Sequence, residues 1–114
     1  MKIFGLKNCD KCRSAAKTLQ VSDIIDVKKT QLPEEILKEA FFNFGEKLVN
    51  RKSTTWKRLD TSELQANSMD LLRKYPSLMK RPLIRTQEGR LFLGWTEEVK
   101  SCLLYTSDAA DEGL

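Results

Sequence analysis

The segment KIFGLKNCDKCRSAAKTL, residues 2–19, decides the fold, because it places a Cys-x-x-Cys pair where a strand passes into a helix. Residues 2–4 are typical of a short strand, and residues 8–20 of a loop followed by a helix. Backbone N–H groups at a helix start carry partial positive charge, so a cysteine there loses its proton well below the ordinary thiol pKa of about 8.5. The thiolate is the reactive form, so the positions of Cys9 and Cys12 indicate thiol chemistry.

The rest of the chain predicts an α/β protein with the order strand, helix, strand, helices, hairpin and helix. A second strand at 24–27 follows the first helix closely, which favours a right-handed unit with parallel strands. Pro33 and the two glutamates after it begin a helix that Gly45 ends. Two more helices are predicted, one at 53–59 and one from Thr61 to about Lys74.

Two apolar runs near the C-terminal end predict an antiparallel hairpin. Residues 82–85 and 90–93 flank a turn in which Gly89 supplies the left-handed backbone geometry. A last helix is expected to start at Thr96, because two glutamates follow it and acidic side chains favour the first turn of a helix.

The composition restricts the chemistry. The 114 residues predict a single domain, and the chain lacks the roughly 18 uninterrupted apolar residues of a membrane span. It begins with a strand-like segment rather than the apolar run of a signal peptide, so the cytoplasm is the expected location. Histidine is absent, which excludes Ser-His-Asp and Cys-His catalysis. One Cys-x-x-Cys pair falls short of an all-cysteine zinc site, so we expect no metal.

The charge distribution favours anionic partners. Twenty Lys and Arg residues against sixteen Asp and Glu residues give a net charge of +4, and every basic residue lies at or before Lys100. Such a surface attracts oxyanions, glutathione or an acidic protein surface. Direct binding of nucleic acid is not expected, because the charges are scattered and aromatic residues do not interleave with them.

The cysteine pair allows two interpretations. With three-residue spacing at a helix start, the first sulfur stays exposed and the second lies one turn in, close enough for a disulfide. Cys9 is then the nucleophile and Cys12 the resolving thiol, and the nearby cations Lys7, Lys11 and Arg13 stabilise the thiolate. The other interpretation is a buried, inert pair.

Two further basic positions are candidates for anion binding. Arg81 precedes Pro82 at the entry to the hairpin, where redox folds with a thiol at the first helix often carry a cis-proline beside the sulfur. Arg81 presents its planar fork to an oxyanion or carboxylate, or is an ordinary surface arginine. Arg51 and Lys52 precede a helix start, which suits an anion site, and capping by Ser53 explains the same sequence equally well.

The chain resembles the ArsC-like arsenate reductase-related family, a branch of the thioredoxin-like fold that also contains the Spx-type transcriptional regulators. The matching stretches recur in family order: GLKNCD at 5–10 with CR at 12–13, LVNR at 48–51, TTWKRL at 54–59, KRPL at 80–83 and LGW at 93–95. The resemblance implies a thioredoxin-like mixed four-stranded sheet, with a helical insertion at about 33–75 between the second strand and the C-terminal hairpin. It also implies a redox-active Cys9.

Two functions remain open on this resemblance. A thiol-dependent oxidoreductase would use Cys9 to attack a disulfide or oxyanion, and Cys12 or glutathione would release the adduct. Its reductant would be glutathione or glutaredoxin, and its anion site would comprise Lys7, Asn8, Arg51, Arg81 and Pro82. An Spx-type regulator would instead bind RNA polymerase through a surface that a Cys9–Cys12 disulfide alters. Asn8-Cys9-Asp10 resembles the reductase-like members more closely, so we prefer the enzyme, as a monomer with no bound cofactor.

Three departures from the family are visible. True arsenate reductases carry a third arginine near the end of the hairpin, where this chain has Leu93-Gly94-Trp95, which argues against arsenate as the substrate. The chain is also shorter than the family between Ala16 and Val27. Residues 102–112 resemble a translated sequencing adapter, so we expect a domain at 1–101 and a non-native tail at 102–114. A genuine polar tail is the alternative.

Overall fold

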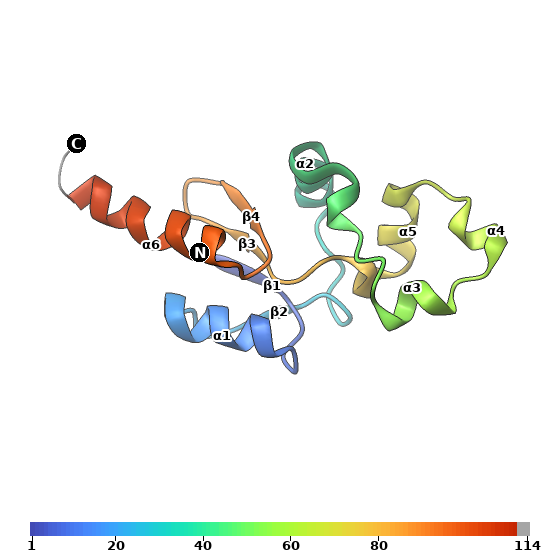
Figure 1. The fold of residues 1–114 in the computed structure, drawn as a ribbon, viewed down its shortest axis with the longest axis horizontal. Helices are drawn as coiled ribbons and strands as arrows, with labels where there is room; N and C mark the ends of the chain where they lie inside the picture. Colours follow the sequence, from blue (N-terminus) through green and yellow to red (C-terminus); the bar gives the residue numbers. More distant parts are fainter. Residues whose placement is uncertain (112–114) are drawn as a thin grey trace.

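A mixed sheet forms the centre of the molecule (Figure 1). The structure, a computed structural model, describes residues 1–111, with side chains as far as Leu104. Its four strands, in the order β2-β1-β3-β4, are β1 (Lys2–Gly5), β2 (Ile25–Asp26), β3 (Leu83–Arg85) and β4 (Leu91–Leu93). β1 pairs parallel with β2 and antiparallel with β3, which pairs antiparallel with β4. The mixed four-stranded sheet predicted from the sequence is confirmed.

Helices connect the strands in the predicted order. The first helix, α1 (Asp10–Leu19), joins β1 to β2, and α6 (Glu97–Asp111) follows β4. Between β2 and β3 lie α2 (Glu34–Phe44), η1 (Gly45–Leu48), α3 (Thr54–Arg58), α4 (Thr61–Leu64), α5 (Ser68–Lys74) and η2 (Pro76–Leu78). In Figure 1, α2 to α5 gather at one end of the molecule, and α1 and α6 lie at the other.

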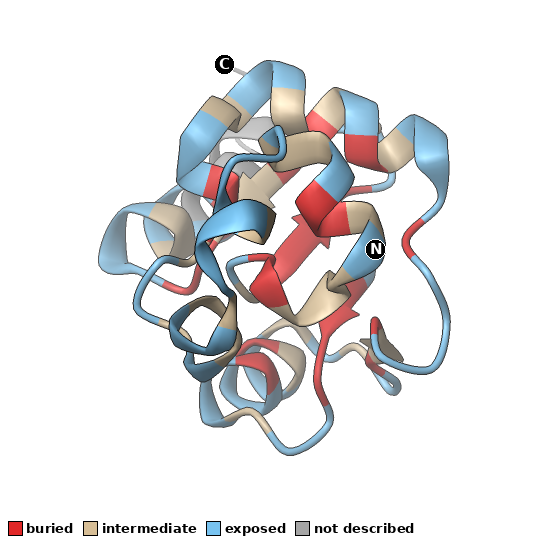
Figure 2. Cartoon of the chain, turned by 90° about the vertical axis from the view of Figure 1, so that its right-hand side faces the viewer, coloured by how far each residue is buried: buried red, intermediate tan, exposed pale blue. Residues whose placement is uncertain are grey.

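Alternation along β1 divides the core into two clusters, because successive side chains of a strand point to opposite faces of the sheet. Ile3 packs with Ile84 of β3 and with side chains of α1 and α6. Phe4 packs with Leu83 and with residues of α2 and α5. The helices between β2 and β3 therefore bury the opposite face from α1 and α6. Figure 2 shows the buried strands among helices whose outer faces are exposed.

The helix predicted from Thr61 to about Lys74 is wrong, because two shorter helices, α4 and α5, occupy this segment. Asp60 begins α4, since its carboxylate accepts a hydrogen bond from the N–H of Glu63 at 2.8 Å. Asn67 begins α5 in the same way, accepting from the N–H of Asp70 at 2.9 Å. An asparagine side chain bonds the N–H groups of a new first turn, so it interrupts a run that the apolar spacing alone would continue.

The ends of the remaining helices and strands lie close to the positions predicted from the sequence. β2 is shorter than the predicted strand at 24–27, although Ile24 and Val27 on either side of it are both buried. Ser53 caps α3 as predicted, because its Oγ accepts from the N–H of Trp56 at 3.1 Å. Gly89 has φ +88 in the hairpin turn, the left-handed geometry that the sequence predicts there.

The predicted tail at 102–114 lies partly outside the described residues. α6 continues through Asp111, and Leu103 is buried against the cluster that contains Ile3 and Ile84. The non-native origin of this segment stays a prediction. None of the helices in the described part of the chain is long and apolar enough to cross a membrane.

Replacement of Ile84 tests the central position of β3. Its side chain is 0% exposed, so Ile84→Ala is expected to lower the free energy of unfolding by about 2–5 kcal/mol in a urea titration. Phe42 on α2 is 89% exposed, so Phe42→Ala is the control and should change the value by less than about 0.5 kcal/mol. Equal losses in the two variants would contradict this core.

Candidate active site

Cys9 lies in the connection between the C-terminal end of β1 and the start of α1. It is the N-cap residue of α1, its N–H donates to the carbonyl of Leu6 at 3.1 Å, and its carbonyl accepts from the N–H of Arg13 at 2.9 Å. Its side chain is partly exposed and packs against both core clusters. Hydrogen bonds therefore hold the backbone on both sides of Cys9, while its side chain stays partly exposed to solvent.

Cys12 lies one turn further into α1 and is fully buried. It packs against Gly5, the last residue of β1, so closely that a Cβ added at Gly5 would overlap Cys12 Sγ. Only glycine leaves room there for the sulfur. The same added Cβ would lie 3.9 Å from Cβ of Arg81, so Gly5 brings the cysteine helix and the entry to β3 together.

The two thiols have opposite pKa shifts. Burial acts to raise the pKa of Cys9, but hydrogen bonds from the backbone and thiol of Cys12 and from the backbone of Lys11, with the positive charge of Arg81, lower it below its ordinary value. Burial raises the pKa of Cys12 to about 12, helped by its hydrogen bond to Cys9 and by the nearby charge of Cys9. Cys9 is thus the thiol that loses its proton more easily, and Cys12 is the neutral thiol that donates a hydrogen bond to it.

Arg81 and Pro82 lie next to this pair, as the sequence suggests. The Arg81–Pro82 peptide bond is cis, and Pro82 is buried. The guanidinium of Arg81 donates from Nη1 to the carbonyl of Ser77 at 3.0 Å. This anchor holds its charge where it acts on both Cys9 and Cys12.

A bridge between distant segments brings the predicted cations to the same side of the molecule. Val49 and Met79 pair antiparallel, flanked by two hydrogen bonds of 2.8 Å, Asn50 N–H to the carbonyl of Leu78 and Lys80 N–H to the carbonyl of Leu48. The segment entering α3 therefore lies beside the segment that leads to Arg81.

Two neighbouring hollows are lined in part by residues close to Cys9 in the sequence, Lys11 in the first and Leu6 in the second. The first, of about 580 Å³, is lined by Lys11, Glu46, Lys47, Val49, Asn50, Arg51, Lys52 and Lys80. The second, of about 320 Å³, is lined by Leu6, Lys28, Asn50, Lys52, Ser53, Thr54, Thr55, Ser77 and Arg81. Asn50 and Lys52 belong to both, so the two hollows adjoin each other. They offer space for a substrate near the start of α1.

Two of the cations predicted to stabilise the thiolate, Lys7 and Arg13, form ion pairs with carboxylates. Lys7 pairs with Asp23 at 3.6 Å, and Arg13 pairs with Asp10 at 2.7 Å. Asn8 is exposed in the loop before α1. These cations are therefore at least partly neutralised by carboxylates, and the charge that lowers the pKa of Cys9 comes from Arg81.

Arg51 lines the larger hollow but is also partly occupied. Its Nη2 lies 2.7 Å from Oε1 of Glu46, and its guanidinium lies over the ring of Trp56, 5.2 Å from the centroid. These contacts fix the planar group in one orientation. A role for Arg51 in binding an anion stays a prediction.

Sequence reasoning missed two residues that arrange the site. Gly5 makes room for Cys12, and the only signal for it was its place at the end of the first strand, three residues before Asn8. Ser77 anchors Arg81 through its carbonyl, and its hydroxyl lies 2.9 Å from that of Thr55. No pattern in the sequence marks a backbone carbonyl for this role.

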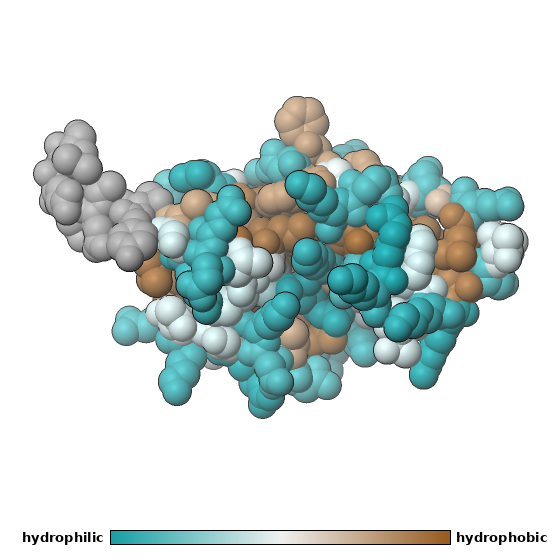
Figure 3. All heavy atoms as spheres, viewed as in Figure 1, coloured by the Kyte–Doolittle hydropathy of each residue, from teal (hydrophilic) through white to brown (hydrophobic). Residues whose placement is uncertain are grey.

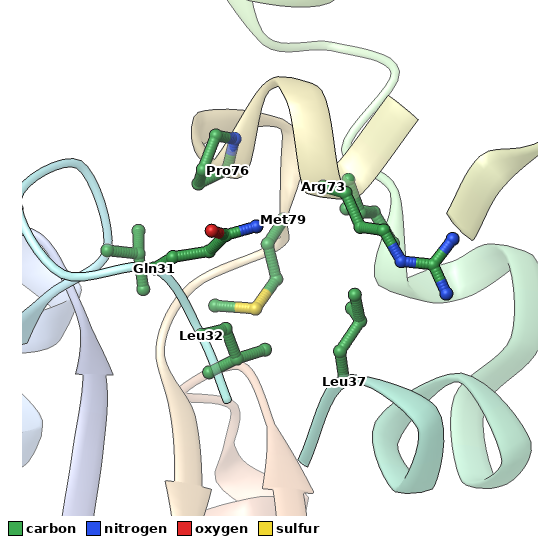
Figure 4. A pocket seen from close by; sticks show the side chains of 8 residues that line it. Gln31, Leu32, Leu37, Arg73, Pro76 and Met79 are labelled. Atoms are coloured by element: carbon green, nitrogen blue, oxygen red, sulfur yellow. The ribbon is translucent and has the colours of Figure 1, made fainter. Parts of the chain in front are cut away.

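A third hollow, away from the cysteines, is too small for a substrate. It measures about 10 Å³ and lies among Val27, Gln31, Leu32, Leu37, Leu72, Arg73, Pro76 and Met79 (Figure 4). A hollow of that volume has room for about one water molecule. The two larger hollows near the start of α1 are therefore the better candidates for a substrate-binding site.

Most of the chain matches a known protein family. Residues 4–101 match the model of the ArsC family. A protein of Haemophilus influenzae named only "Uncharacterized protein" is 36% identical over 107 residues, which cover 84% of this chain and 91% of that protein. The match to the family model ends at Ser101, where the segment resembling an adapter begins.

Solved structures share the architecture. The YFFB protein superposes with a TM-score of 0.75 at 25% identity, covering 88% of this chain and 95% of that one. An arsenate reductase (ArsC) related protein from Brucella melitensis gives a TM-score of 0.62 at 28% identity, covering 90% and 93% of the two chains. The thioredoxin-like fold expected from the sequence is confirmed.

Removal of the Arg81 charge tests the cause of the thiolate. Because that charge lowers the pKa of Cys9, Arg81→Ala should raise the pKa and shift the pH profile of Cys9 alkylation by iodoacetamide to higher pH. At neutral pH the rate, followed by peptide mass spectrometry, should fall about threefold to tenfold. Arg58→Ala, on the exposed end of α3, is the matched control and should leave the profile unchanged. An unchanged profile in Arg81→Ala would exclude this cause.

Replacement of Gly5 tests the packing of Cys12. Gly5→Ala places a methyl group onto Cys12 Sγ, so it should lower the free energy of unfolding by about 1–3 kcal/mol. In a Cys12→Ala background the sulfur is gone and the nearest remaining atom, Cβ of residue 12, would lie at 3.4 Å. The same replacement should then cost much less. Equal costs in the two backgrounds would show that the sulfur is not the obstacle.

Proposed function

We propose that this chain, which belongs to the ArsC family, is a thiol-dependent oxidoreductase in which Cys9 is the attacking group and Cys12 the resolving thiol. The observation that carries the proposal is the division of roles between the two sulfurs. Cys9 is partly exposed with a lowered pKa, whereas Cys12 is fully buried and donates its proton toward Cys9. An inert pair would have no reason to differ in this way.

The first step is the attack of the Cys9 thiolate on a sulfur of a disulfide. A bond forms between Cys9 Sγ and that sulfur, the substrate S–S bond breaks, and the leaving thiolate takes a proton. Helix α1 favours negative charge at its N-terminus, where Cys9 lies. An oxyanion with a displaceable oxygen is the other substrate class that such a thiolate attacks.

The second step uses a change in the pKa of Cys12. Burial raises the pKa of Cys12 to about 12, and the hydrogen bond to Cys9 and the negative charge of the Cys9 thiolate contribute to this increase. Once Cys9 is in a mixed disulfide, its negative charge is gone and both influences disappear, so the pKa of Cys12 falls. Cys12 then loses its proton more easily and attacks Cys9 Sγ, which releases the reduced substrate. An external thiol such as glutathione, or glutaredoxin, returns the resulting disulfide to two thiols, or resolves the adduct in place of Cys12.

Arg81 and the hollow around it suit the negative charge of these steps. Its anchored guanidinium lies beside the reacting sulfurs, and Ser53, Thr54 and Thr55 add hydroxyl groups to the lining of the same hollow. A fixed positive charge stabilises a thiolate leaving group or an oxyanion without moving during the reaction.

Turnover by cysteine variants tests the proposal. Purified protein is assayed for reduction of a small disulfide coupled to glutathione and glutaredoxin. Cys9→Ser should lose activity by about a thousandfold or more, because no nucleophile remains. Cys12→Ser should complete the first step, accumulate a mixed disulfide visible by mass spectrometry, and turn over only as fast as external glutathione resolves it. Cys102→Ser, exposed in α6, is the matched control and should retain wild-type activity.

The same preparations test the regulatory alternative. RNA polymerase is offered to the reduced and the oxidised protein in a pull-down. Polymerase binding that changes with oxidation, in a protein without turnover, would favour the regulator over the enzyme. Full turnover by Cys9→Ser would remove Cys9 as the nucleophile.

A further inference from the structure

The larger hollow, which Lys11 of α1 helps to line and which is called here the basic groove, carries unbalanced positive charge. It is lined by Lys11, Lys47, Arg51, Lys52 and Lys80, and Glu46 is the single acidic residue among its lining residues. The lysines that form ion pairs in the described part of the chain are Lys7, Lys74 and Lys100, none of which lies in the groove. The four groove lysines are all exposed.

Glu46 does not balance this charge. Its carboxylate accepts from Arg51 at 2.7 Å and from the hydroxyl of Ser68 at 2.6 Å, so it is already occupied by one cation and one hydroxyl. The charge of Arg51 is compensated by this pair, and the four lysines are not. In Figure 3, hydrophilic side chains gather over the middle of the visible face, between α1 and α3.

The position of the groove links this charge to the thiolate. Lys11, two residues after Cys9, lines the groove, and Leu6, whose carbonyl accepts from the N–H of Cys9, lines the adjoining hollow. The bridge between Val49 and Met79 holds the opposite wall in place. At about 580 Å³, the groove is far larger than a tetrahedral oxyanion needs, so its volume favours a larger ligand.

We propose that the basic groove binds an acidic polypeptide segment next to the disulfide that Cys9 reduces, so that the substrate is a disulfide-bearing protein. The proposal rests on the oxidoreductase function proposed above. Aspartate and glutamate side chains pair with the groove lysines and orient the substrate sulfur toward Cys9. The two electrons come from the Cys9–Cys12 dithiol, which becomes a disulfide, while the substrate disulfide takes two electrons and two protons to become a dithiol. Two molecules of a low-molecular-weight thiol then return the pair to its reduced form and themselves become a disulfide.

A polypeptide fits these observations better than a nucleic acid. Nucleic acids contain no disulfide for the adjacent thiolate to attack. Binding of single strands also relies on aromatic rings that stack on bases, and no aromatic residue lines the groove in the described part of the chain. Lysines on flexible stems suit carboxylates that approach in varied positions along a segment.

Two synthetic peptides test the proposal. Both have the same length and one internal disulfide, and they differ in that glutamates around the cysteines of the first are glutamines in the second. The wild-type protein should reduce the glutamate peptide with a kcat/KM about tenfold higher, and this preference should shrink at high salt. The double variant Lys47→Glu/Lys52→Glu should lose the preference, so that it no longer reduces the glutamate peptide with a higher kcat/KM than the glutamine peptide. Lys17→Glu/Lys38→Glu, an equal charge change outside the groove, is the matched control and should keep the preference.

Binding without chemistry separates this proposal from the oxidoreductase function. The Kd of both peptides, with serines in place of their cysteines, is measured by fluorescence anisotropy. The glutamate peptide should bind more tightly, and the groove variant should weaken it about tenfold. Equal binding of the two peptides, an unaffected groove variant, or an oligonucleotide of equal charge that binds as tightly would each overturn the acidic-polypeptide assignment. Tight binding that depends on the lysines, without reduction of any disulfide, would support the groove and overturn the oxidoreductase.

Discussion

The packing of the buried Cys12 sulfur against Gly5 is the contact on which the site depends. It fixes α1 against the end of β1, so the first cysteine of the pair stays at the rim of the sheet while the second is enclosed. Enclosure keeps Cys12 protonated, and a protonated Cys12 is what Cys9 needs as a hydrogen-bond donor. This packing therefore contributes to the partial exposure of Cys9 and to the lowering of its pKa, together with the backbone hydrogen bonds and the charge of Arg81.

The helices between β2 and β3 supply the substrate side of the same site. Their buried faces cover the sheet face opposite α1 and α6, while the bridge at Val49 and Met79 brings their exposed, basic segment beside Arg81. The cations that line the two hollows come from four places in the chain: the start of α1, the segment after β2, the approach to α3, and the approach to β3. In the proposed function, α1 carries the reacting sulfurs, and the insertion supplies most of the residues for substrate binding.

Much of the fold could be predicted from the sequence because its signals are local. The apolar alternation of β1, the glycine of the hairpin turn and the cap at Ser53 each act within a few residues, and each has the expected geometry. The break between α4 and α5 was missed because the apolar spacing continues across it, and the capping of Asn67 outweighs that weak periodicity.

The site was harder to predict, because its geometry depends on contacts between distant residues. Cys9 and Arg81 are marked by their motifs, but the pairing of Arg51 with Glu46, of Lys7 with Asp23, and the anchoring of Arg81 by Ser77 have no sequence signal. Such pairings decide which cations are available to a thiolate. Proximity in the sequence suggested Lys7 and Arg13, whereas the charge that acts on Cys9 comes from a residue some seventy positions away, Arg81.

The most direct test of this account is a titration of the reduced protein by NMR, with ¹³C at the Cβ of each cysteine, so that every sulfur reports its own pKa. We expect the Cys9 signal to titrate below the ordinary thiol pKa, and the Cys12 signal to titrate with a pKa of about 12. Substitution of Cys12 by alanine should raise the pKa of Cys9, because the donated hydrogen bond is lost. Titration of both cysteines together near the ordinary thiol pKa, or of Cys12 before Cys9, would contradict it.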